Sequence, residues 1–159
     1  MELGDERNPA RLSPRRPVGV EPLDVYERRG DGHTLSRHCG TSPAVEAERL
    51  AHHPLLPATG SFPDASTAQR AVEACVAASA TEVTRWRRGR RSRLVLDHDM
   101  GDVIGDVLQR SRWAAGDLTP QPATGVRVVL RRNGRYQAGY AVLTAYPVLH
   151  RPDATSRQP

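Results

Sequence analysis

The chain has 159 residues, which is enough for one domain with tails and for a sizeable hydrophobic core. Its net charge is +5 and all 23 basic residues are arginine, a bias that fits either a polyanionic partner or a genome rich in G and C. Two cysteines are too few for a disulfide framework, and no apolar run approaches the roughly 18 residues of a membrane span.

Both ends of the chain lack the pattern of a folded segment. Residues 1–29 mix prolines, arginines and acids without a sustained period, which predicts a disordered linker or the end of a longer delivery polypeptide. No apolar stretch of a signal peptide begins the chain, so we expect it to have no leader of its own. Residues 150–159 are polar and are expected to form a flexible tail. The folded domain is therefore predicted over residues 30–149.

Two short helices are predicted to meet at Gly40, a residue type that commonly ends helices. The second of them would begin with Ser42 as N-cap and Pro43 at the first helical position. His33 and His38 in the first helix are five residues apart, or about 140° around a helix. This spacing does not match the histidine pair of zinc proteases, so we expect no metal site.

A longer amphipathic helix is predicted from Ser66 to near Gly89, because apolar residues recur three and four positions apart. Ser66 and Gln69 have the spacing of a capping box. The end of this helix is crowded with arginines, namely Arg85, Arg87, Arg88, Arg90, Arg91 and Arg93. Such a run suits contact with a nucleic-acid backbone, but also a solvated helix end whose dipole it complements.

From Arg93 onward the apolar residues alternate, which predicts strands at residues 94–96, 103–109, 125–132 and 136–146. The dipeptide Asn133-Gly134 predicts a tight hairpin, because both residue types tolerate positive φ. Helices come first and antiparallel strands follow. The sequence therefore predicts an α+β domain.

The last strand carries two hydroxyls close to its end. Thr144 and Tyr146 are two residues apart and would share one face, and regular alternation would place Tyr140 and Val142 on that face too. Pro147 cannot continue a central ladder. The pattern suits two hydrogen-bond donors at the mouth of a cleft, or an ordinary strand end that meets solvent.

Several motifs in this order resemble a known family. They are Gly32–Leu35, His38–Ser42 with Arg49-Leu50, Ser61–Asp64 with Thr67-Ala68, Ala123–Leu130 and Leu143–Pro147. Together they resemble the bacterial RNase A-like toxin domain, which is found at the C-terminus of contact-dependent growth-inhibition and other polymorphic toxins. The resemblance spans about residues 30–149. It departs from the family at Cys39, where an aliphatic residue is expected, and at Thr41, where a basic one is common.

The resemblance implies a fold, a reaction and a set of site residues. The fold would be α+β and RNase A-like, with N-terminal helices followed by a twisted antiparallel sheet and without disulfides. The reaction would be metal-independent endoribonuclease cleavage of RNA without a cofactor. The family's active-site residues match His38, Arg49, Thr144 and Tyr146.

The chemistry of these residue types agrees with that assignment. Attack of the RNA 2′-hydroxyl on the adjacent phosphate needs a base, an acid for the leaving oxygen, and donors around the phosphorane. His38 can act as base or acid because imidazole titrates near neutral pH, and Arg49 can clamp phosphate oxygens. Thr144 can bond a base edge or phosphate, while Tyr146 can donate to the phosphorane or assist the leaving group.

Three further residues and the partners complete the expectations. His33 is a candidate second imidazole or a helix-start residue, and Arg37 and Arg127 are expected to contact RNA. The resemblance implies an RNA substrate, a cognate immunity protein, a monomer without membrane contact, and delivery into the target-cell cytoplasm within a larger secreted toxin. A non-catalytic nucleic-acid-binding module, or a toxin fold with another activity, remains open at this point.

Overall fold

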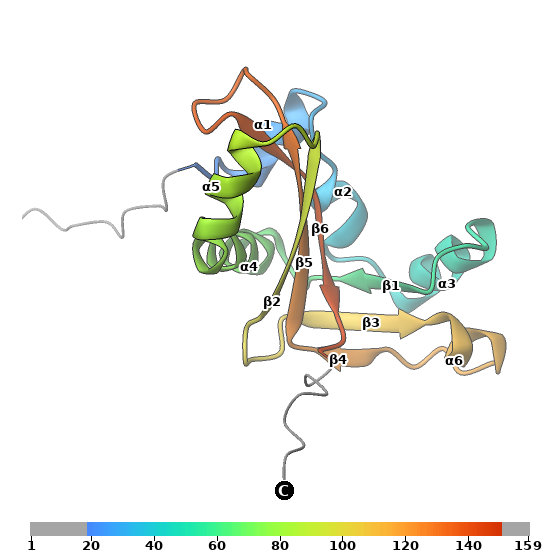
Figure 1. Ribbon diagram of the computed structural model, residues 1–159. Coiled ribbons are helices and arrows are strands. Elements are labelled where there is room, and N and C mark those ends of the chain that lie inside the picture. The colour runs from blue at the N-terminus through green and yellow to red at the C-terminus, as the bar shows by residue number, and fades with distance from the viewer. Residues whose placement is uncertain (1–18, 151–159) are drawn as a thin grey trace, which may run out of the picture.

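The computed structural model describes residues 19–150. Figure 1 shows how helices and strands are arranged in this part of the chain. The elements are α1 (Leu23–Arg28), α2 (Thr34–His38), α3 (Pro43–His52), β1 (Ala58–Ser61), α4 (Ala65–Ala78), α5 (Ala80–Arg88), β2 (Arg93–Asp99), β3 (Gly105–Gln109), α6 (Arg110–Ala114), β4 (Gln121–Ala123), β5 (Gly125–Arg132) and β6 (Tyr140–Val148).

The strands form two three-stranded antiparallel sheets, in the orders β2-β5-β6 and β1-β3-β4. The two sheets run at a steep angle to one another, and α4 and α5 lie on one side of the first (Figure 1). The second sheet leads away on the other side, towards α3 and α6. The α+β class is therefore confirmed, with the antiparallel strands divided between two sheets.

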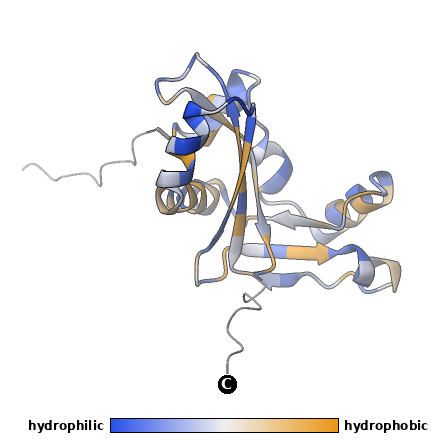
Figure 2. Ribbon diagram, viewed as in Figure 1, coloured by the Kyte–Doolittle hydropathy of each residue, from blue (hydrophilic) through white to orange (hydrophobic). Residues whose placement is uncertain are grey.

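The main core lies between α4 and the β2-β5-β6 sheet. The helix contributes small side chains spaced three and four residues apart, namely Ala68, Ala71, Val72 and Cys75, all fully buried. The sheet contributes alternate aliphatic residues, namely Leu94, Leu96, Val126, Val128 and Leu130. Figure 2 shows an orange, apolar stretch along β2 between blue, polar ends. Cys39 and Cys75 are both free thiols, so the domain is held by packing.

The folded unit begins earlier than residue 30. Within the segment predicted to be disordered, α1 buries Leu23 and Tyr26 in the core. The Leu23 backbone N donates to the Gln69 side chain at 2.8 Å, and the Glu21 backbone N donates to the Tyr26 hydroxyl at 2.9 Å. The contact with Gln69 joins residues distant in sequence, and a six-residue helix is too short to leave a periodic signal. The rest of the predicted linker, residues 1–18, and residues 151–159 of the predicted tail lie outside the described residues.

The predicted long helix is two helices. α4 ends at Ala78 and α5 begins at Ala80, so the chain breaks at Ser79. The apolar pattern already contained this break, because Ala78 and Val83 are five residues apart. The N-cap is also different from the prediction, since Asp64 accepts the hydrogen bond from the Thr67 backbone N at 2.7 Å.

The connection between β5 and β6 is not a two-residue hairpin. β5 ends at Arg132 and β6 begins at Tyr140. Among residues 19–150, positive φ occurs only at glycines; Gly139 has a φ of 81°, whereas Gly134 is not one of these glycines. The Tyr136 side chain turns inward, and its hydroxyl donates to Asp31 at 2.6 Å. A tertiary contact thus lengthens a loop for which Asn133-Gly134 favoured a tight turn.

A β-bulge lies in the middle of β6. Val129 pairs with Thr144, but the next residue of β5, Leu130, pairs with Val142, so Leu143 has no partner on β5. Directly opposite residues share a face of a sheet. Val142 therefore joins the core with Leu130, while Thr144 lies on the opposite face with Val129. The prediction that Val142 and Thr144 share a face is wrong because the bulge interrupts the alternation.

Candidate active site

His38, the last residue of α2, is held against strand β1. Cys39 forms a parallel bridge with Phe62, whose backbone N donates to the His38 carbonyl at 2.7 Å. The His38 ring then reaches the Gly60 carbonyl, with 3.1 Å between Nδ1 and O. A carbonyl oxygen can only accept, so Nδ1 carries the proton and Nε2 keeps its lone pair. No pattern of residue types indicates Gly60, because it acts through its backbone.

The environment of His38 disfavours its charged form. Burial lowers the pKa of His38 to about 4, and the positive charges of Arg49 and Arg37 also lower it, against the opposing hydrogen bond to Gly60. Arg49 Nη1 lies 3.4 Å from Nδ1, a close approach of charge rather than a donated bond, because Nδ1 is already protonated for Gly60. His38 is therefore neutral at neutral pH and can accept a proton at Nε2.

Arg49 joins α3 to the end of α2. Its Nη2 donates to the Arg37 carbonyl at 2.7 Å, and its Nη1 lies 3.7 Å from the Glu46 carboxylate. The side chain is only 19% exposed. Thr41 donates its hydroxyl to the other Glu46 oxygen. Glu46 is not among the residues predicted from the sequence, although its spacing of three residues from Arg49 on a helix is that of an ion pair.

Two rings lie beside the ring of His38. The ring centroids of His38 and Tyr146 are 5.2 Å apart, and those of His38 and His33 are 6.4 Å apart. The backbone N of His33 donates to the Leu143 carbonyl at 3.0 Å, which attaches the start of α2 to the bulge of β6. Burial and the neighbouring Arg37 lower the pKa of His33 as well.

Thr144 presents an unused hydroxyl next to these rings. It lies two residues from Tyr146 on the same face of β6, as their pairing with Val129 and Arg127 shows. Its Oγ1 is buried and has no hydrogen-bond partner among residues 19–150. An unsatisfied buried hydroxyl is costly, which makes it a ready donor for a ligand.

The two arginines expected to contact RNA lie in different surroundings. Arg37 is exposed, and its hydrogen bonds are made by its backbone, whose carbonyl accepts from Arg49 and whose N donates to the His33 carbonyl. Arg127 lies opposite Tyr146, and its guanidinium is bidentate with Asp97 at 2.7 and 2.8 Å. The hydrogen bond to Asp97 raises the pKa of Arg127 above its already high value. Both arginines thus lie near the cluster of His38, Arg49 and Tyr146. Of the two, only Arg37 has a side chain that is free of ion pairs within residues 19–150.

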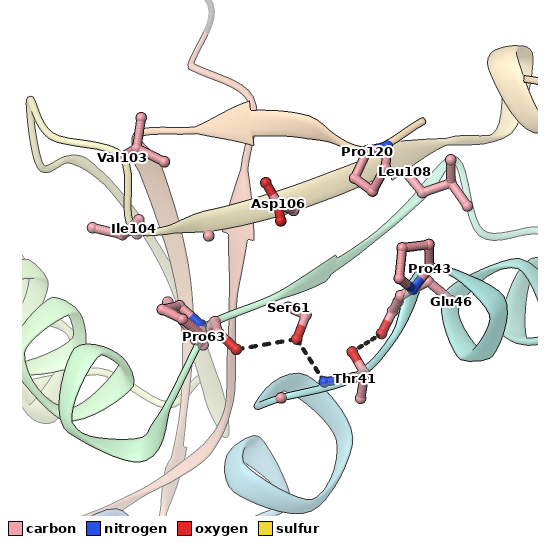
Figure 3. Close-up of a pocket in the computed structure, with 13 residues that line it drawn as sticks. Thr41, Pro43, Glu46, Ser61, Pro63, Val103, Ile104, Asp106, Leu108 and Pro120 are labelled. Atoms are coloured by element: carbon pink, nitrogen blue, oxygen red, sulfur yellow. Dashed lines mark hydrogen bonds between the residues drawn. The ribbon is translucent and has the colours of Figure 1, made fainter. Parts of the chain in front are cut away.

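One pocket lies beside this cluster rather than within it. Its volume is about 350 Å³, and its lining includes Thr41, Glu46, Ser61 and Asp106 but not His38 or Tyr146. Figure 3 shows Ser61 bridging the Thr41 backbone and the Phe62 carbonyl at its wall. Within residues 19–150, no three histidine, cysteine or acidic side chains meet as metal ligands. In the same range, no helix is long and apolar enough to cross a membrane.

The domain is α+β and has no disulfides. At its candidate site, a neutral histidine adjoins a tyrosine, an arginine and a free hydroxyl. These are the groups that RNA cleavage through the 2′-hydroxyl requires. The family model of the bacterial CdiA-CT RNAse A domain matches residues 32–147. The crystal structure of a CdiA-CT/CdiI complex from Y. kristensenii is similar, with a TM-score of 0.64 and 22% identity over 74% of this chain and 99% of that one. No curated protein matches the chain.

The chain therefore belongs to the bacterial CdiA-CT RNase A domain family, a family of ribonuclease toxin domains of contact-dependent inhibition systems. The predicted family is thus confirmed, as is the predicted α+β fold without disulfides. CdiA-CT domains are delivered as part of a larger toxin.

Proposed function

We propose that this domain is a metal-independent endoribonuclease that cleaves RNA by attack of a 2′-hydroxyl on the adjacent phosphate. The observation that carries the proposal is the state of His38. Its Nδ1 is protonated for the Gly60 carbonyl, and its pKa of about 4 leaves Nε2 free to accept a proton at neutral pH. A neutral imidazole beside a phenol supplies the base and a donor without any metal ion.

The remaining groups would stabilise the phosphorane and the leaving oxygen. Thr144 can donate its hydroxyl to a phosphate oxygen, since that hydroxyl has no partner within residues 19–150. Tyr146 is near enough to His38 for both to act on one phosphate. Arg49 adds positive charge and holds His38 in place through the Arg37 carbonyl. A bound phosphate would raise the pKa of His33, which could then act as the acid.

Activity should be measured with a fluorogenic RNA and with DNA of the same sequence, both in excess EDTA. We expect RNA to be cut and DNA to be spared, because DNA lacks the nucleophile. His38→Ala should lose about a hundredfold or more in rate, the usual size of acid–base catalysis. The matched control His53→Ala, at an exposed position at the end of α3, should keep full activity. A requirement for added magnesium, or equal cutting of DNA, would refute the mechanism.

We further propose that the domain acts in the cytoplasm of a target cell and that a cognate immunity protein restrains it in the producing cell. The similar CdiA-CT structure is a complex with CdiI, which supports a partner of this kind. The net charge of +5 favours an acidic inhibitor that associates quickly at low salt. Association measured by stopped flow should slow markedly as salt rises. A partner that binds equally fast at low and high salt would rule out electrostatic steering.

A further inference from the structure

The face of the β2-β5-β6 sheet that carries Thr144 and Tyr146 continues away from the catalytic cluster. Side chains directly opposite each other, or two residues apart along a regular strand, share this face. The register gives three successive groups on it, which are Asp97, Arg127 and Tyr146, then Val95, Val129 and Thr144, then Arg93 and Arg131. Successive groups are about 7 Å apart, the rise of two strand residues.

The outermost group is a pair of like charges. Arg93 and Arg131 are direct cross-strand partners and both are exposed. Like charges directly opposite each other destabilise a sheet. Neither guanidinium has a hydrogen bond or an ion pair among residues 19–150, whereas Arg127 is paired with Asp97 on the same face. This unneutralised pair has a cost in the free protein that a bound anion would remove.

The middle group lies between the basic pair and the group of Tyr146, and it combines Thr144 on β6 with two valines on β5 and β2. Val95 is 52% exposed and Val129 is half-buried, so an apolar step lies between two polar ones. This apolar surface can contact the flat face of a base, and the basic pair beside it can bind a phosphate. A single nucleic-acid strand with one phosphate at Thr144 can therefore lay the adjoining base on the valines at the same level and its next phosphate on the basic pair.

We propose that Arg93 and Arg131 form a subsite for the phosphate next to the scissile one on single-stranded RNA, with the intervening base resting on Val95 and Val129. The assignment rests on the proposed function, which places the scissile phosphate at Thr144 and Tyr146. Along the strands, the basic pair lies one group, about 7 Å, from Thr144 and two groups, about 14 Å, from Tyr146, so the subsite adjoins a phosphate held at Thr144. Two guanidinium forks bind phosphate oxygens through paired, charge-assisted hydrogen bonds.

Binding of a fully 2′-deoxy, non-cleavable hexanucleotide tests the subsite without any catalysis. We expect R93Q/R131Q to bind about tenfold more weakly at low salt by fluorescence anisotropy, with a salt slope smaller by about one to two. The control R85Q/R88Q removes the same charge from exposed positions on α5 and should stay within twofold of the parent. Equal losses in the two variants would show a general effect of charge and overturn the subsite.

Cleavage separates this proposal from the proposed function. For R93Q/R131Q we expect kcat/KM to fall about tenfold on a hexanucleotide RNA and to stay within twofold on a dinucleotide, which has only the scissile phosphate. If the parent cleaves neither RNA, the proposed function fails, and the anisotropy measurement still decides the subsite. A variant that melts earlier but binds the hexanucleotide normally would assign the pair to the fold and overturn the subsite.

Discussion

His38 shows how the surroundings of one residue select its chemistry. An imidazole in water exchanges protons near pH 6.5 and can serve as acid or base. Here, burial lowers its pKa to about 4, while the Gly60 carbonyl fixes the proton on Nδ1. Both effects leave Nε2 as an acceptor at neutral pH. Base is therefore the role that we propose for His38.

The pH dependence of cleavage should reveal this base. Since kcat/KM reports groups of the free enzyme, its acid limb should fall near pH 4 to 5 rather than near 6.5. Arg49→Gln removes a positive charge that lowers the His38 pKa, so it should move that limb to higher pH. Rates on a fluorogenic RNA, together with NMR titration of the His38 ring, measure both. An acid limb that stays near pH 6.5 would show that His38 is not held in its neutral form.

Thr144→Val separates activity from stability at the unsatisfied hydroxyl. The change keeps the side-chain volume and removes a buried oxygen without a partner among residues 19–150. We expect the melting temperature to hold or rise, because an unsatisfied buried group costs about 1–3 kcal/mol. Activity should fall about tenfold or more if the hydroxyl contacts the substrate. Unchanged kcat/KM would remove Thr144 from the site.

At the scale of elements, the bulge of β6 attaches α2 to the catalytic strand. Leu143, which has no partner on β5, offers its carbonyl to the backbone N of His33. Just before α2, Gly32 lies so close to β6 that an added Cβ would be 2.5 Å from the Val142 carbonyl. The close approach of these two backbones sets the position of His33 and His38 against Tyr146.

Gly32→Ala should therefore disturb the site as well as the fold. The new methyl group meets backbone rather than a flexible side chain, so the start of α2 must move. We expect a loss of about 1–3 kcal/mol in the free energy of unfolding, as for overpacking, together with reduced cleavage by the folded fraction. The control Gly134→Ala adds the same methyl where nothing lies within 4 Å. If both variants unfold at the same denaturant concentration, the close approach is not structurally important.

The parts of the fold that are encoded locally were predictable. Ser42 and Pro43 begin α3 as their types suggest, because capping depends on neighbours in sequence. The position of α1, the bulge at Leu143 and the long turn closed by Tyr136 depend on contacts between distant residues, which no local pattern contains. For the site, the resemblance indicated residues that the fold gathers into one cluster. The role of Gly60 becomes visible only in its hydrogen bond with His38, and the Arg93–Arg131 pair only in the register of the strands.

At the scale of the whole molecule, the depressed histidine pKa makes stability depend on pH. The folded pKa of His38, about 4, lies below its value of 6.5 in the unfolded chain. Between these pH values the unfolded state binds more protons, so stability is complete above about pH 6.5 and is lost as the pH falls towards 4. The shift corresponds to about 3 kcal/mol. His33, whose pKa is also lowered, acts in the same direction.

Urea unfolding at pH 7 and at pH 4.5 tests this dependence. The parent protein should lose stability between the two, and His38→Gln should lose clearly less, because it has no proton to take up on unfolding. His53→Gln, at an exposed site, should behave like the parent. The same loss in His38→Gln and the parent would assign the acid sensitivity to other groups.

The central claim is that the RNA strand supplies its own nucleophile, and one substrate tests it directly. An otherwise 2′-deoxy oligonucleotide with a single ribonucleotide should be cut in EDTA only at that ribose, leaving a 2′,3′-cyclic phosphate that mass spectrometry identifies. Methylation of that one 2′-hydroxyl should abolish the cut. Cleavage of the methylated strand would contradict attack by the 2′-hydroxyl. A product that carries its phosphate at the 5′ end would contradict it as well.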